Sequence, residues 1–104
     1  MTHTPQYENW QGLETLCCVE RRQETEDAVT LVLKPTKALA VSYLPGQFLV
    51  LNVTIQGQSH SRAYSLCSAP QIDRELAVTV KRVDGGLVSN WLLDHFHVGD
   101  ELTA

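Results

Sequence analysis

Apolar and polar residues alternate along most of the chain, and a period of two predicts β-strands. The first predicted strand, residues 13–23, places Leu13, Thr15, Cys17 and Val19 on one face, and Glu14 and Glu20 on the other. A charged turn at 24–27 leads into a second strand, which Pro35 ends because proline cannot donate to the ladder. A third strand alternates from Phe48 to Ile55 and stops at a predicted turn at 56–58.

The second half of the chain keeps the alternation and breaks it once. Residues 60–67 and 75–83 predict two further strands. Residues 87–96 instead repeat their larger side chains at helical spacing, and these are Val88, Trp91, Leu92, His95 and Phe96. A turn at 98–100 is followed at 101–104 by the opening of a strand that we expect to be unpaired, as in a piece of a longer protein.

Five or six short antiparallel strands, one helix and regular turns predict a small β-barrel. The length of 104 residues predicts one domain, with a polar segment at 1–12 and the barrel at 13–104. Hydrophobic residues make up 43% of the chain and charged residues 19%, which is typical of a globular protein.

Charge and cysteine usage narrow the function further. The net charge of −4 disfavours a general affinity for nucleic acid, although Arg62, Arg74, Lys81 and Arg82 place four of the eight basic residues within 21 positions. Three cysteines without a CxxC pair indicate reduced thiols, and the N-terminus lacks a signal peptide, so we expect a cytoplasmic protein. No apolar run approaches the roughly 20 residues of a membrane-spanning helix.

The first candidate site is the sequence Arg62-Ala63-Tyr64-Ser65. Residues two apart on a strand face the same side, so Arg62 and Tyr64 offer a cation and an aromatic ring about 6.6 Å apart. A guanidinium clamps a phosphate with paired hydrogen bonds, and a tyrosine ring stacks on a flat ligand. The alternative is a solvent-facing arginine beside a packed tyrosine.

The second candidate site is the glycine-led start of the predicted helix. Gly85 and Gly86 let backbone N–H groups approach an anion, and Ser89 adds a hydroxyl in the first turn. Lys81 and Arg82, just before the turn, would add positive charge. The alternative for Gly85 and Gly86 is an ordinary turn that gives the helix a flexible entry. The alternative for Lys81 and Arg82 is a strand end exposed to solvent.

Five segments in a fixed order complete the picture. They are Pro45-Gly46-Gln47-Phe48, Arg62-Ala63-Tyr64-Ser65 with Ser68-Ala69-Pro70, Val80-Lys81-Arg82-Val83, Gly86-Leu87-Val88-Ser89 and Val98-Gly99-Asp100-Glu101-Leu102. Together they resemble the flavin-binding barrel of the ferredoxin–NADP reductase superfamily, and most of all the reductase components of bacterial oxygenases. The resemblance implies a mainly all-β fold, a six-stranded antiparallel Greek-key β-barrel with one helix.

The resemblance also implies a site for FAD rather than FMN. Arg62 would bind the pyrophosphate, Tyr64 would stack on the isoalloxazine ring, and Ser65 would lie near its N5 atom. Strict alternation turns Ser65 away from Tyr64, so its contact requires a bend or its backbone N–H. The implied set is Arg62, Ala63, Tyr64, Ser65, Val80, Lys81, Arg82, Gly85, Gly86, Leu87, Val88 and Ser89.

Reductases of this superfamily continue into an NAD(P)H-binding domain, and many carry a [2Fe–2S] domain. This sequence has no GxGxxG pattern, and its three cysteines cannot build such a cluster. The resemblance therefore implies one module of an NAD(P)H-dependent oxidoreductase that passes electrons through flavin to an iron–sulfur or haem partner, with little activity alone. Two alternatives stay open, a barrel that docks a partner without flavin and an OB-like barrel that binds single-stranded nucleic acid.

Overall fold

The computed structural model describes residues 8–9, 12–40, 46–67 and 75–104. The predicted polar segment at 1–12 lies almost wholly outside these ranges. Pro45, Arg74 and the segment at 68–70 also lie outside them.

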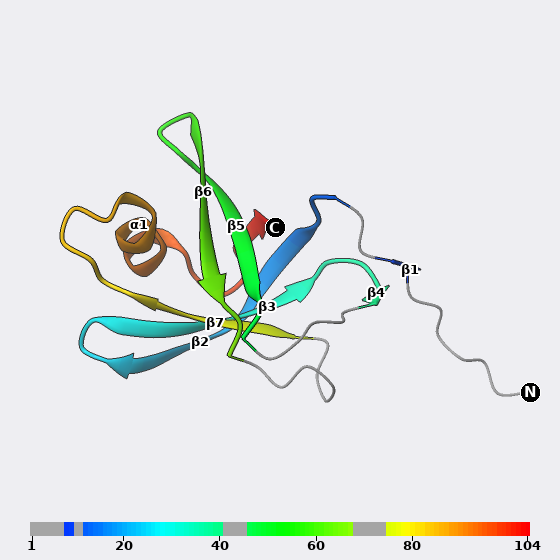
Figure 1. Cartoon of the computed structure of the whole chain (residues 1–104), viewed down its shortest axis with the longest axis horizontal. Coiled ribbons are helices and arrows are strands. Elements are labelled where there is room, and N and C mark those ends of the chain that lie inside the picture. The colour runs from blue at the N-terminus through cyan, green and yellow to red at the C-terminus, as the bar shows by residue number, and fades with distance from the viewer. Residues whose placement is uncertain (1–7, 10–11, 41–45, 68–74) are drawn as a thin grey trace, which may run out of the picture.

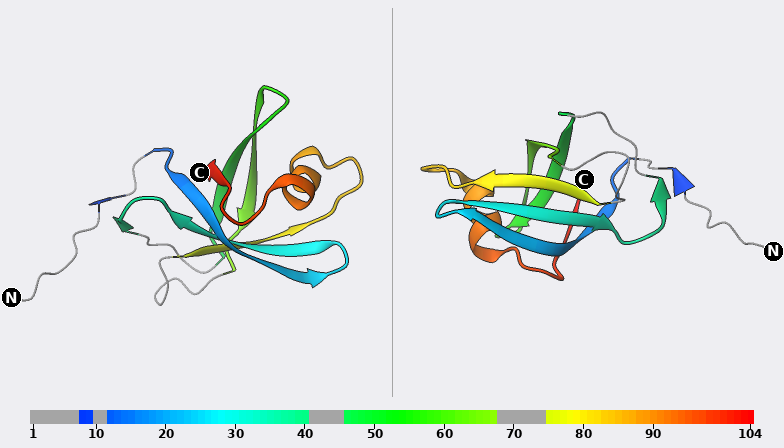
Figure 2. Two further views of the ribbon diagram at one scale, coloured as in Figure 1. Left: turned by 180° about the vertical axis from the view of Figure 1, so that it is seen from behind. Right: turned by 90° about the horizontal axis from the view of Figure 1, so that it is seen from below.

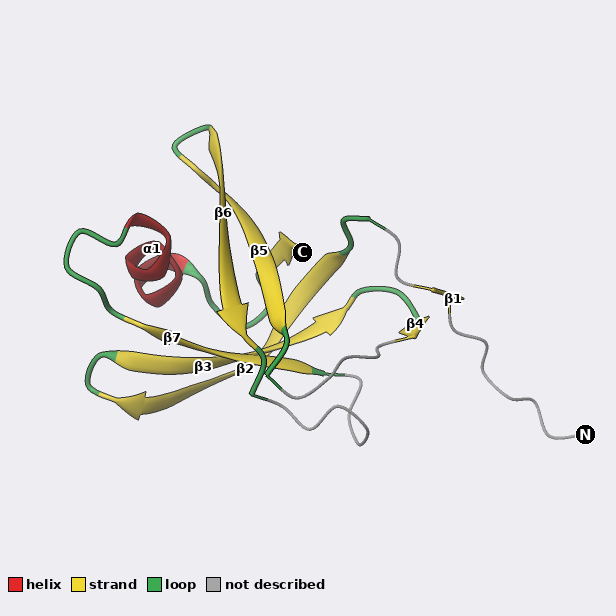
Figure 3. Cartoon of the chain, viewed as in Figure 1, coloured by secondary structure: helices red, strands yellow, loops and turns green. Residues whose placement is uncertain are grey.

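Mainly antiparallel strands and one helix make up the described structure (Figures 1 and 3). The elements are β1 (Glu8–Asn9), β2 (Thr15–Thr25), β3 (Ala28–Pro35), β4 (Leu39–Ala40), β5 (Phe48–Ile55), β6 (Gln58–Ser65), β7 (Leu76–Lys81), α1 (Leu87–His95) and β8 (Glu101–Thr103). The described residues form a six-stranded sheet in the order β6-β5-β8-β2-β3-β7, and β1 pairs with β4 as a short parallel ribbon.

The six-stranded sheet curls so that its two edge strands meet at one end (Figure 2). Leu66, just after β6, bridges to Val78 of β7, and the N–H of Cys67 donates to the carbonyl of Ala77 over 2.9 Å. The sheet is not closed along its whole length, and α1 packs against both edge strands. β2 pairs with β3 and β5 with β6 as two hairpins, and longer connections add β7 and β8 to the same sheet. This arrangement confirms the predicted Greek-key, barrel-like class with one helix.

The final strand is not the unpaired edge that the sequence suggested. β8 lies inside the sheet, where it pairs with residues 15–17 of β2 and, at Thr103, with Asn52 of β5. Glu14 and Ala104 also exchange two backbone hydrogen bonds of 2.9 Å. The expectation was wrong because a strand late in sequence can fill a vacant place between two early ones, which alternation does not reveal.

The structure buries the face of the first strand opposite to the one that carries Leu13, Cys17 and Val19. Leu16 and Cys18 are buried, with 0% and 1% exposure, whereas Leu13 is 70% exposed. Apolar residues occupy both faces of this segment, and pairing with β3 and β8 selects the face that turns inward. A register shift between Cys18 and Glu20 then changes which residues face inward along the rest of β2.

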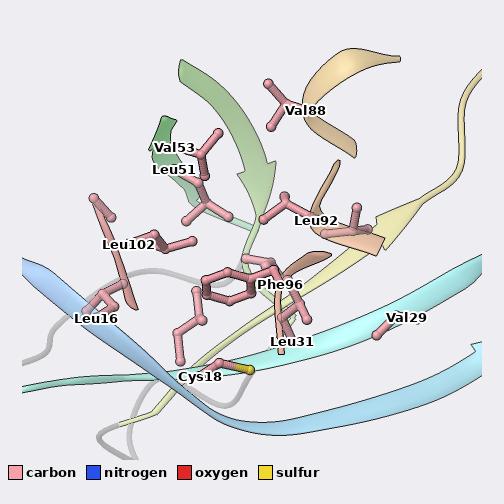
Figure 4. Close-up of a cluster of buried hydrophobic side chains, with 14 of the residues drawn as sticks. Leu16, Cys18, Val29, Leu31, Leu51, Val53, Val88, Leu92, Phe96 and Leu102 are labelled. Carbon is pink, nitrogen blue, oxygen red and sulfur yellow. The ribbon is translucent and has the colours of Figure 1, made fainter. Parts of the chain in front are cut away.

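The core lies between the two hairpins and α1. In Figure 4, Phe96 is surrounded by side chains from β2, β3, β5, β8 and the helix. On α1 the buried residues are Val88, Leu92 and Leu93, while Trp91 is half-buried and His95 exposed, so the predicted stripe is confirmed only in part. The β5–β6 hairpin turns through Gln56 and Gly57, which both have positive φ, as a two-residue hairpin loop requires.

No described helix is long and apolar enough to cross a bilayer.

Candidate cofactor-binding site

β6 places the Arg-Ala-Tyr-Ser segment along one edge of the sheet (Figure 1). Arg62 stands opposite Leu51 of β5, and Tyr64 stands opposite Leu49. Cross-strand partners share a side of the sheet, so Arg62 and Tyr64 both project from the side that carries the core leucine. Tyr64 is half-buried and packs against the core, whereas Arg62 is exposed.

Arg62 is free to engage an anion. Its Nη1 donates to the carbonyl of Ser61 over 2.8 Å, and no carboxylate in the described part of the chain forms an ion pair with it. A guanidinium has five N–H donors, so the donors that do not bond to the Ser61 carbonyl can still recognise an anion.

Ala63 and Ser65 lie on the opposite side of β6. They pair with Val50 and Phe48 of β5, and all four side chains are exposed. Their side chains therefore point away from that of Tyr64, and they can reach a ligand on the Tyr64 side only through the backbone.

The start of α1 lies beside Tyr64. The hydroxyls of Tyr64 and Ser89 are 3.0 Å apart and hydrogen-bonded, although 25 positions separate the two residues in sequence. This bond joins the two candidate sites, because Ser89 lies in the first turn of the helix. An aromatic ring, a helix start and a guanidinium two residues along β6 thus gather in one region of the surface.

A tight turn delivers the chain to the helix. The N–H of Gly86 donates to the carbonyl of Val83 over 2.8 Å, and Gly85 has a φ of +73°, a value that favours glycine. The side-chain amide of Asn90 holds Val83 from the helix side, accepting its N–H at 3.3 Å and donating to its carbonyl at 2.9 Å. A Cβ on Gly86 would lie 2.9 Å from the Cβ of Val83, so the close approach requires glycine at that position too.

The helix start is open to an anionic group. Gly86 is the N-cap residue and provides no side-chain cap, and the first turn holds no acidic residue. The leading N–H groups of a helix have no partner within it, and the aligned peptide dipoles favour negative charge there. A surface depression of about 390 Å³ lies beside the turn and is lined by Gly85, Gly86, Leu87 and residues of the outer face of α1.

The structure limits how three of the predicted residues could contact a ligand. The side chains of Val80 and Val88 are 0% and 1% exposed and belong to the core, so only their backbone groups can contact a ligand. Arg82 is engaged by Asp94 of α1, with nitrogen–oxygen distances of 2.6 and 3.3 Å. Lys81 is exposed at the end of β7, and Leu87 is 49% exposed at the start of the helix.

The Arg82–Asp94 pair changes the ionisation of both groups. Its side-chain hydrogen bonds raise the pKa of Arg82 and lower the pKa of Asp94. Arg82 is thus engaged in an exposed ion pair, whereas Arg62 pairs with no carboxylate among the described residues, which makes Arg62 the better candidate for an external anion.

Sequence reasoning missed two residues that hold this region in place, Asn90 and Arg21. Asn90 holds the turn through its hydrogen bonds to Val83. The only feature of the sequence that could have indicated this role is a polar residue at the fourth position of the helix. Arg21 bonds to the far end of α1, and no local pattern predicts that contact because it spans 71 positions.

Comparisons with known proteins match this chain over most of its length. Residues 16–104 match the family described as the oxidoreductase FAD-binding domain. The glycine betaine monooxygenase reductase subunit of Pseudomonas aeruginosa is 37% identical over 91 residues, which cover 88% of this chain and 25% of that protein. This chain thus spans about a quarter of the length of that relative.

Solved structures of similar proteins share the fold. The FAD/NAD-binding domain of nitric oxide dioxygenase from Vibrio cholerae superposes with a TM-score of 0.80 at 34% identity, over 86% of this chain and 41% of that chain. The ferredoxin reductase in carbazole 1,9a-dioxygenase superposes with a TM-score of 0.76 at 29% identity, over 88% of this chain and 27% of that chain.

Proposed function

This chain belongs to the oxidoreductase FAD-binding domain family, and on that premise we propose that it binds FAD across β6 and the start of α1. One observation supports the location above all others, the 3.0 Å hydrogen bond between Tyr64 and Ser89. It brings the only half-buried tyrosine ring of the described β6 strand against the only helix start in the described residues.

The residues present fit a flat, phosphorylated cofactor. The ring of Tyr64 supplies a stacking surface, and the guanidinium of Arg62 supplies an anion clamp that is not engaged by a described carboxylate. Gly86 lets the turn pack closely against Val83, where an added Cβ would lie 2.9 Å from the Val83 Cβ, and the helix start that follows it has no side-chain cap. A negatively charged diphosphate would satisfy the N–H groups of the first turn.

The roles follow from this arrangement. Arg62 and the backbone N–H groups at 87–89 hold the pyrophosphate, and Tyr64 orients the isoalloxazine ring. Ser65 contributes through its backbone, as do Val80 and Lys81 at the end of β7. Bound FAD supplies the redox chemistry, accepting hydride and releasing single electrons, while the barrel supplies binding and orientation.

The intact protein is proposed to be an NAD(P)H-dependent reductase. We infer this from the names of its relatives, which include a monooxygenase reductase subunit, a ferredoxin reductase component of 3-ketosteroid-9-alpha-monooxygenase and a flavohemoprotein. Electrons from NAD(P)H, bound by a further domain, pass through the flavin to an iron–sulfur or haem partner, with a [2Fe–2S] domain as one form of that partner. Because all three cysteines are free thiols, which fits a reducing compartment, we propose that the protein works in the cytoplasm.

Titration of FAD into the protein tests the proposal. Arg62→Ala is expected to weaken FAD binding by about 1.5–3 kcal/mol, or roughly tenfold to a hundredfold, the usual contribution of hydrogen bonds to a charged group. Lys34→Ala is the matched control, since it removes an exposed cation from β3. Equal affinity of wild type and Arg62→Ala would refute the pyrophosphate assignment, and a wild type that binds no FAD would favour the alternative barrel that docks a partner without flavin.

A further inference from the structure

Arg21 of β2 reaches across the end of the barrel to the last turn of α1. Its Nη1 donates to the carbonyls of Leu92 and Phe96, at 3.0 and 2.5 Å, and its Nη2 donates to the carbonyl of Leu93. One half-buried guanidinium therefore serves three carbonyl groups at the C-terminal end of the helix that begins at the proposed pyrophosphate site.

The register shift in β2 is what directs Arg21 to this position. Leu16 and Cys18 face the core before the shift, and strict alternation would turn Glu20 inward after it. The shift between Cys18 and Glu20 instead places Arg21 opposite the buried Leu31 of β3, on the inner side. Arg22 stays exposed and pairs with the Glu20 carboxylate at 3.0 Å.

These contacts matter because α1 cannot hold its own geometry. A helix of nine residues is marginal in water and depends on tertiary anchors. The last four carbonyls of a helix have no partner within it, and positive charge at this end opposes the negative pole of the dipole. At about 1.5 Å per residue, α1 is only about 14 Å long, so a tilt at its C-terminal end displaces its start.

We infer that Arg21 is a positioning residue for the cofactor site. By fixing the C-terminal end of α1 to β2, it sets the place and direction of the N–H groups at 87–89 and of the Ser89 hydroxyl that bonds to Tyr64. The inference rests on the proposed function, in which those N–H groups receive the pyrophosphate. Arg21 itself does not touch the ligand, because it contacts the opposite end of the helix.

Comparing two ligands separates this role from general stability. FAD carries the diphosphate and engages both the ring of Tyr64 and the helix start, whereas riboflavin offers the same ring system without phosphate. Arg21→Met is expected to raise the dissociation constant of FAD about tenfold, and that of riboflavin less than about twofold. Arg21→Lys keeps the charge and should recover part of the FAD affinity. Arg22→Met, which removes the neighbouring exposed arginine, should bind both ligands like wild type.

Amide hydrogen exchange gives a readout that does not depend on the ligand. In Arg21→Met the amides of 90–96 are expected to exchange about tenfold faster than in wild type, while those of β3 keep their protection. All comparisons are made below the onset of thermal unfolding, and Arg21→Lys replaces Arg21→Met if the latter does not fold.

Three results for Arg21→Met would overturn the inference. They are amide exchange in α1 as slow as in wild type, an equal loss of affinity for FAD and riboflavin, and unchanged affinity for both ligands. A wild type that binds no FAD would refute the proposed function instead, and the exchange comparison then decides by itself whether Arg21 fixes the helix. Selective loss of FAD affinity together with faster exchange confined to α1 supports it.

Discussion

Replacing Gly86 by alanine tests the turn that leads into α1. The backbone φ of Gly86 is −78°, which any residue can adopt, so the change adds a methyl group without dihedral strain. That methyl group would lie 2.9 Å from the Cβ of Val83 and 3.1 Å from its carbonyl oxygen. The same carbonyl accepts the hydrogen bonds of Gly86 and Asn90, so it cannot move without weakening them. We expect the overpacking to cost about 1–3 kcal/mol of unfolding free energy.

Urea denaturation and FAD titration measure the two consequences separately. Because the methyl group displaces the first N–H groups of α1, FAD binding should weaken about tenfold as well, the effect of roughly one hydrogen bond to a charged group. Gly57→Asn in the β5–β6 turn, outside the proposed site, is the matched control: no atom lies within 4 Å of an added Cβ there, and asparagine tolerates its φ of +79°. Stability of Gly86→Ala within about 0.5 kcal/mol of wild type, with unchanged FAD affinity, would refute the reasoning.

Three further substitutions or reactions examine single contacts. Tyr64→Phe removes the 3.0 Å bond to Ser89 and should cost about 0.5–1.5 kcal/mol in urea melts, with no further loss in the Tyr64→Phe/Ser89→Ala double variant; fully additive losses would contradict the bond. The hydrogen bond from Arg82 lowers the pKa of Asp94 below its ordinary 3.8, so the pair stabilises the fold above that value and ceases to as pH falls through the lower folded-state pKa. Asp94→Asn should remove this part of the acid dependence, and superimposable stability–pH curves would disprove the assignment. The thiol of Cys67 is exposed and should react with a thiol reagent in the folded protein, while the buried thiol of Cys18 should react only on unfolding. Equal reaction rates of Cys67 and Cys18 in the folded protein would contradict the described burial.

Local patterning was enough to predict most of the elements. The third predicted strand, residues 48–55, is confirmed with its bounds, because the alternation runs over the whole segment and the turn after it needs Gly57. The helix is confirmed at 87–95 because its large apolar residues recur at helical spacing. The face of β2 was not predictable, since Leu16 and Val19 make both faces of that segment apolar and pairing decides between them.

Part of the candidate site could be predicted from the sequence, and part depends on tertiary packing. The sequence alone could place Arg62 and Tyr64 on one face, because residues two apart on a β-strand project from the same side. The bond from Tyr64 to Ser89 and the engagement of Arg82 by Asp94 depend on how α1 packs against β6 and β7, which no local pattern encodes. Their roles toward FAD remain predictions that the substitutions above test.

Retention of FAD after desalting tests the central claim most directly. The protein and a Tyr64→Ala/Arg62→Ala variant are each mixed with excess FAD, passed through a desalting column and examined by visible absorption. We predict that the wild type leaves the column with flavin bands in near-stoichiometric amount and that the variant, which lacks both the stacking ring and the anion clamp, leaves it colourless. A colourless wild type, or equal retention by both proteins, would contradict the assignment of β6 and the start of α1 as the FAD site.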